Sequence, residues 1–119
     1  MSGSAPVKPA WKGFFWLAAA YNVVIGLGSF LAAPWGTPEA VSAVLIVCFG
    51  IVYGMVAYDP RRFAPVLIAG VLGKAMVVAM FGPPNWFGNG DSAVGLIVAG
   101  DLIFMLGFMW FLLREKRHA

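Results

Sequence analysis

One lysine and one aspartate differ from the other charged residues of this chain because each lies inside a long apolar stretch. Lys74 lies in a stretch that begins near Phe63, and Asp101 lies in one that begins near Ser92. An amine and a carboxylate in such surroundings can form an ion pair, relay a proton, or bind an ion or solute. Ionisable groups are rare in long apolar helices and often mark functional sites.

Three further polar side chains interrupt apolar stretches and are candidates for the same site. Tyr21 and Asn22 lie in the first stretch, and Tyr53 lies in the second. Asn22, Gly26 and Ser29 are spaced four and three residues apart, so a helix would place them on one face. That polar, small-residue face is able to approach the lysine and the aspartate. The predicted polar cluster consists of Asn22, Tyr53, Lys74 and Asp101, with Tyr21 as a fifth member.

The sequence predicts no catalytic residue, no cofactor and no metal site. His118 is the only histidine and Cys48 the only cysteine, so an ordinary zinc site and an intrachain disulfide are both unsupported. No Ser-His-Asp set, phosphate-binding loop or dinucleotide motif is present. Cys48 lies in an apolar run, where we expect it to pack as a small hydrophobic residue.

The composition indicates that lipid surrounds most of this chain. Of its 119 residues, 61% are hydrophobic and only 11% are charged, whereas a soluble domain carries about 25% charged residues. A water-soluble fold of this size buries too little surface to hide so many apolar side chains. The cations lie at the ends of apolar stretches rather than in one patch, which predicts contact with membrane lipids and no nucleic-acid partner.

Four apolar stretches predict four transmembrane helices, at about residues 13–33, 40–58, 63–81 and 92–113. Each is close to the roughly 20 residues that cross about 30 Å of hydrocarbon. Membrane-spanning strands require a closed barrel, which these uniformly apolar segments do not fit. The short connections favour antiparallel neighbours. We therefore predict an all-α membrane protein, a single transmembrane domain over residues 1–119 that forms an antiparallel four-helix bundle. Gly82, Pro83 and Pro84 are expected to end the third helix.

The basic residues predict the orientation of this bundle. Cytoplasmic segments carry an excess of Lys and Arg, and the two loops after the first and third helices contain neither. Both termini are therefore predicted to be cytoplasmic, in a bacterial-type inner membrane. A cleaved signal peptide is a weaker interpretation, because the first stretch exceeds the usual core of about 7–15 residues. The cations at helix ends are Lys8, Lys12, Arg61, Arg62, Arg114, Lys116 and Arg117.

The predicted depths of Lys74 and Asp101 bring the two residues to the same level. Lys74 is about eleven residues from the cytoplasmic start of the third helix, roughly 16 Å deep. Asp101 is about nine residues from the outer start of the fourth, roughly 13 Å deep. In a core of about 30 Å both lie near the midplane. Because an unpaired charge there costs about 2.5–3.5 kcal/mol, we predict a Lys74–Asp101 ion pair, which either joins the helices or serves a functional site.

Glycine pairs occur in the second, third and fourth stretches. Small residues allow membrane helices to approach closely. We expect these glycines to pack helices within the chain, with a dimer interface or a docking face for a larger membrane protein as the alternative. The pairs are Gly50 with Gly54, Gly70 with Gly73, and Gly95 with Gly100.

Several short motifs together resemble a set of small, uncharacterised bacterial four-helix integral membrane proteins. The motifs are Tyr21-Asn22 with Gly26, Asp59-Pro60-Arg61-Arg62, Gly70 with Gly73-Lys74, and Asp101. The resemblance implies the same four-helix fold over most of the chain and brings no known activity with it. The chain is also similar in helix number to small multidrug-resistance transporters, but it has no acidic residue in the first helix, where those proteins bind drug and proton.

Three classes of function fit this sequence. The first is a structural or accessory subunit of a membrane assembly, which docks onto a larger membrane protein or onto itself. The second is a transporter of a small solute, or a proton- or ion-coupled carrier, that uses Lys74 and Asp101. Because four helices enclose little volume, a carrier would require a homo-oligomer. The third is a membrane enzyme that modifies a lipid or quinone, for which the sequence supplies no recognisable catalytic group beyond Lys74, Asp101 and the tyrosines.

Overall fold

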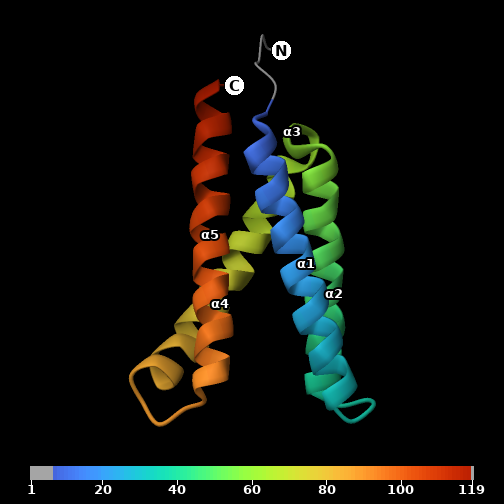
Figure 1. The fold of residues 1–119 in the computed structure, drawn as a ribbon, viewed down its shortest axis with the longest axis vertical. Coiled ribbons are helices and arrows are strands. Elements are labelled where there is room, and N and C mark those ends of the chain that lie inside the picture. Colours follow the sequence, from blue (N-terminus) through green and yellow to red (C-terminus); the bar gives the residue numbers. More distant parts are fainter. Residues whose placement is uncertain (1–6, 119) are drawn as a thin grey trace. The chain divides into compact units, whose positions relative to one another are not determined.

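The computed structural model describes residues 7–118, with side chains up to residue 115. This part of the chain is almost entirely helical and contains no strand (Figure 1). Four helical segments are long and apolar enough to cross a membrane, which confirms the predicted all-α class and indicates a multi-pass membrane protein. They are Pro9–Ala32, Pro38–Tyr58, Pro60–Trp86 and Ser92–Glu115.

The chain divides into two compact units. The first contains the described residues up to Ala64, and the second begins at Pro65. Within the first unit α1 packs against α2, and within the second α4 packs against α5. The helices are α1 (Pro9–Ala32), α2 (Pro38–Tyr58), α3 (Pro60–Phe63), α4 (Leu67–Trp86) and α5 (Ser92–His118), with a 3₁₀ turn, η1 (Ala64–Val66), between α3 and α4.

Glycines bring α1 and α2 into close contact. A Cβ atom on Gly26 of α1 would lie 2.6 Å from a methyl group of Val47 in α2. A Cβ atom on Gly50 of α2 would lie 2.7 Å from a methyl group of Val23 in α1. Gly26 follows Val23 in α1, but its partner Val47 precedes Gly50 in α2. The contacts therefore run in opposite order along the two helices, which form a hairpin. These contacts agree with the expectation that Gly50 packs helices within the chain.

The turn between α1 and α2 is built from residues suited to it. Gly36 has a φ of 81°, a left-handed conformation that favours glycine. The Thr37 hydroxyl accepts the N–H of Ala40 at 3.3 Å and donates to the carbonyl of Pro34 at 2.7 Å. The hydroxyl thereby satisfies one of the free N–H groups at the start of α2.

Hydrogen bonds across the α4–α5 connection hold the second hairpin together. The indole N–H of Trp86 donates to the carbonyl of Gly95 at 2.9 Å. The side-chain oxygen of Asn85 accepts the N–H of Asp91 at 2.7 Å, and the carboxylate of Asp91 accepts the N–H of Ala93 at 2.7 Å. These bonds fix the point at which α5 begins.

The predicted end of the third helix near residue 81 is wrong, because α4 continues through two prolines to Trp86. A proline removes a helical N–H donor and usually ends or kinks a helix. Here the last turn is held by other contacts. The side-chain amide of Asn85 donates to the carbonyl of Phe81 at 2.7 Å, and Trp86 is anchored to Gly95.

The helical segment that begins close to the predicted residue 63 is interrupted by a short 3₁₀ turn. The Asp59 carboxylate accepts the N–H of Arg62 at 3.5 Å and caps the short helix α3. Pro65 has no N–H to donate, and the chain forms the 3₁₀ turn before α4 begins at Leu67. The remaining helices match the predicted spans but extend further, to Pro9 and Pro38 at their starts and to His118 at the end of α5.

Many bulky apolar side chains face outward from the helices. Leu31 of α1 is 83% exposed and Leu96 of α5 is 76% exposed. A soluble monomer rarely exposes large continuous apolar surface. These side chains therefore suit a lipid environment, as the composition predicts.

Candidate functional site

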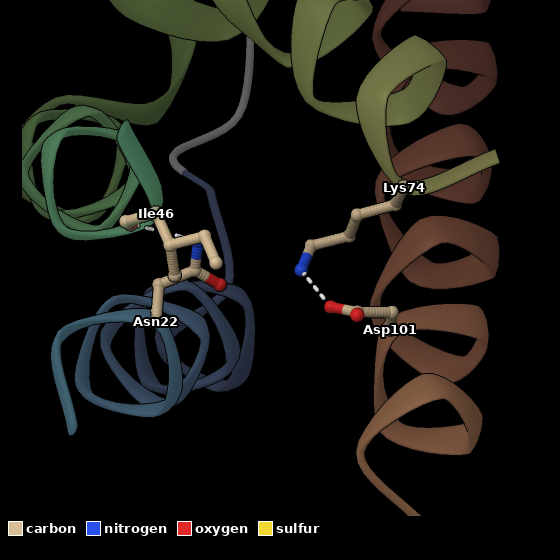
Figure 2. A network of polar contacts seen from close by, with 4 residues as sticks. All are labelled: Asn22, Ile46, Lys74 and Asp101. Atoms are coloured by element: carbon tan, nitrogen blue, oxygen red, sulfur yellow. Dashed lines mark hydrogen bonds and ion pairs between the residues drawn. The ribbon is translucent and has the colours of Figure 1, made fainter. Parts of the chain in front are cut away.

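The candidate site is an ion pair between α4 and α5. The ammonium nitrogen of Lys74 lies 2.5 Å from a carboxylate oxygen of Asp101, as Figure 2 shows. The Lys74 side chain is 6% exposed and the Asp101 side chain 14% exposed. The ion pair predicted from the helical depths of these residues is therefore present in the structure.

An aromatic ring lies beside this pair. The ammonium of Lys74 is 5.7 Å from the centroid of the Phe104 ring, a distance at which a cation is attracted to the ring face. Asp101, Phe104 and Phe108 are spaced three and four residues apart along α5, so they share one helical face. Both phenylalanines are buried. One face of α5 thus supplies the lysine with both a counter-ion and an aromatic neighbour.

The electrostatics of this arrangement favour a closed pair. Opposite charges in a poorly solvated environment attract strongly, and each removes much of the penalty of burying the other. Among the described residues, no buried side-chain nitrogen or oxygen lacks a hydrogen-bond partner. The ion pair therefore belongs to an interior in which polar groups are satisfied by the protein itself.

Asn22 has a partner that the sequence did not reveal. Its buried side-chain amide donates to the backbone carbonyl of Ile46 at 3.1 Å, across the α1–α2 contact (Figure 2). A helical carbonyl has a second lone pair, so Ile46 is able to accept this bond beside its helical one. The amide of Asn22 thus joins α1 to α2. The partner is a backbone atom, which no residue type in the sequence indicates.

Replacing Asn22 with leucine should weaken the α1–α2 hairpin by about 1 kcal/mol, because hydrogen bonds between membrane helices typically contribute between about 0.6 and 1.7 kcal/mol. Denaturation with sodium dodecyl sulfate in mixed micelles would measure the loss. Ser29→Ala on the same helix is a suitable control because Ser29 is exposed. Equal stability of the Asn22→Leu variant and the unmodified chain would contradict the role given to this bond.

The two tyrosines of the predicted cluster lie in the same unit as Asn22. Tyr53 of α2 is buried, and its ring centroid is 6.1 Å from that of Phe49. Tyr21 of α1 is half-buried. Lys74 and Asp101 belong to the other unit. The structure thus confirms the ion pair within the cluster, and a cluster of all five residues stays a prediction.

Cys48 is not packed inside the protein, although its apolar run predicts a packed small hydrophobic residue. Its side chain is exposed on α2, because α2 turns the face that contains Gly50 and Tyr53 inward. Over the described range, no group of three or more His, Cys, Asp or Glu side chains is close enough to hold a metal ion. The side chains of Lys116, Arg117 and His118 lie outside the described residues.

No protein-family model, curated protein or solved structure matches this chain. The resemblance to small four-helix membrane proteins therefore stays a prediction from its motifs.

Proposed function

We propose that this chain is a structural or accessory subunit of a membrane assembly. Its four long helices form one antiparallel bundle in a bacterial-type inner membrane, with both termini in the cytoplasm. Its role is to present a stable helical surface to a larger membrane protein or to another copy of itself. The lipid-facing apolar side chains and the absence of Lys and Arg from two of the three interhelical connections support this arrangement.

The observation that carries the proposal is the closed geometry of the ion pair. Lys74 and Asp101 contact each other directly, and both side chains are largely buried. A pair of this kind specifies which helices become neighbours, since α4 without α5 would leave a charge in hydrocarbon. An ion pair engaged in this way supports a structural role.

A carrier is the second candidate, and the presence of two ionisable groups within membrane-spanning helices favours it. Proton and ion pathways through membranes commonly use such residues. A carrier would break and remake the Lys74–Asp101 contact during its cycle. It would also require several copies of this chain, because four helices enclose little volume.

Exchanging the two charges distinguishes these functions. The Lys74→Asp/Asp101→Lys variant still contains an ion pair between α4 and α5, with the two charges exchanged. A structural role is therefore preserved, whereas a transport site is altered. We expect liposomes that contain the unmodified chain to dissipate a pH gradient no faster than empty liposomes. We also expect the exchanged variant to keep the native assembly size in mild detergent, while each single exchange loses it.

The matched control for this experiment is Gly28→Ala on α1, because a Cβ atom there meets no other atom within 4 Å and Gly28 belongs to none of the predicted glycine pairs. A gradient that collapses with the unmodified chain, and is maintained when either charged residue is neutralised, would establish the carrier instead. If the chain, extracted in mild detergent from its native membrane, never exceeds the mass of one chain, the accessory role is contradicted.

A further inference from the structure

One end of the α1–α2 unit brings together cations from two separate parts of the chain. Near this end, Trp16 of α1 lies close to Gly54 of α2, where a Cβ atom would be 3.5 Å from the indole ring. Lys12 is one helical turn before Trp16, and Lys8 is one turn earlier still. Beyond Gly54, α2 ends and the chain forms α3, which packs against α2. Figure 1 shows the start of α1 and α3 at the same end of this unit.

The charge at this end is positive. The side chains of Lys8, Lys12 and Arg62 are exposed. Neither α1 nor α3 has an acidic residue in its first turn. The adjacent carboxylate, Asp59, accepts the backbone N–H of Arg62 and caps α3. This cap fixes the backbone from which the Arg62 side chain extends.

Aromatic residues adjoin two of these cations in the sequence, Trp11 before Lys12 and Phe63 after Arg62. The Trp11 ring is 5.8 Å from that of Phe14 and 6.0 Å from that of Phe15, next to Lys12 in the sequence. The Arg62 guanidinium lies 5.3 Å from the centroid of the Phe63 ring. Aromatic residues favour the boundary between headgroups and hydrocarbon, and long basic side chains extend from there to phosphate groups.

We propose that this end of the α1–α2 unit is a binding site for the headgroup of an anionic phospholipid. Lys8, Lys12 and Arg62 contact the phosphate. The half-buried rings of Trp11, Phe14 and Phe63 pack against the upper part of the acyl chains. The opposite end of the unit contrasts with it, because residues 33–39 contain no Lys or Arg and include Glu39. This proposal requires that the chain spans a membrane, and it is independent of the accessory role.

Native mass spectrometry of the full chain in neutral detergent would test this site, with phosphatidylglycerol and phosphatidylcholine supplied at equal concentration. We expect phosphatidylglycerol to bind at least tenfold more tightly. Each surface cation strengthens binding to anionic lipid by about fivefold. The Lys8→Gln/Lys12→Gln/Arg62→Gln variant should therefore lose most of the preference, and the charge-conserving Lys8→Arg/Lys12→Arg/Arg62→Lys variant should keep it. Circular dichroism would verify that each variant remains helical.

Two further comparisons locate the site and identify its ligand. Lys12→Gln should weaken phosphatidylglycerol binding about fivefold, whereas Arg114→Gln, which removes one cation from α5, should change it less than twofold. Soluble glycerol phosphate should not displace the bound lipid. The proposal is overturned if Arg114→Gln weakens binding as much as Lys12→Gln, if the triple glutamine variant keeps its preference, or if glycerol phosphate competes with the lipid.

Discussion

Replacing Lys74 with leucine should destabilise the α4–α5 hairpin by about 3 kcal/mol, the scale of breaking a buried ion pair by removing one partner. The carboxylate of Asp101 would remain in an apolar environment without its counter-ion. Asp101→Leu should have an effect of similar size, since it leaves the Lys74 ammonium unpaired. Unfolding in mixed micelles, followed by circular dichroism, would measure both changes.

The double variant Lys74→Leu/Asp101→Leu identifies the origin of this loss. A well-packed apolar pair often replaces a buried ion pair with little change in stability. We therefore expect the double variant to recover most of the stability that either single variant loses. If the loss in the double variant equals the sum of the two single losses, the two side chains contribute independently and the ion pair does not connect the helices.

The ion pair could be predicted from the sequence because two simple constraints converge on it. Helical rise converts residue number into depth, and this places Lys74 and Asp101 at one level of neighbouring helices. The penalty for an unpaired charge in hydrocarbon then requires a partner. The structure supplies that partner at 2.5 Å. The four apolar spans could be predicted on similar grounds, because hydrophobic length is a property of composition.

The end of α4 could not be predicted, because local and tertiary signals conflict there. Gly82, Pro83 and Pro84 are typical of a helix end, but α4 continues to Trp86. The indole of Trp86 donates to Gly95, which is nine residues further along the chain. Local propensity contains no information about that contact.

The partner of Asn22 was missed for a related reason. Its helical spacing with Gly26 and Ser29 predicts one face, of which Asn22 and Gly26 are buried against α2 while Ser29 is exposed. The spacing does not identify the opposing helix. The amide bonds to the backbone of Ile46. Backbone carbonyls occur at every residue, so nothing in the sequence distinguishes this one.

The close approach of α1 and α2 leads to the second large expected effect. Gly26→Ala should destabilise the α1–α2 hairpin by about 1–3 kcal/mol, the usual scale of overpacking a close contact. The added Cβ atom would lie 2.6 Å from a methyl group of Val47, 2.9 Å from the Val47 backbone nitrogen and 3.0 Å from the Ala43 carbonyl oxygen. The methyl group belongs to a stiff β-branched side chain, and the other two atoms are backbone, so the helices themselves must separate.

Gly28→Ala is the matched control for Gly26→Ala, because it makes the same chemical change two residues further along α1. A Cβ atom on Gly28 meets no other atom within 4 Å, and alanine favours a helix over glycine by up to about 1 kcal/mol. Gly28→Ala should therefore be neutral or stabilising in the same micelle unfolding measurement. Adding Val47→Ala to Gly26→Ala removes the closest methyl group but leaves the backbone contacts, so recovery should be partial. If Gly26→Ala and Gly28→Ala have the same stability, α1 and α2 do not pack through Gly26.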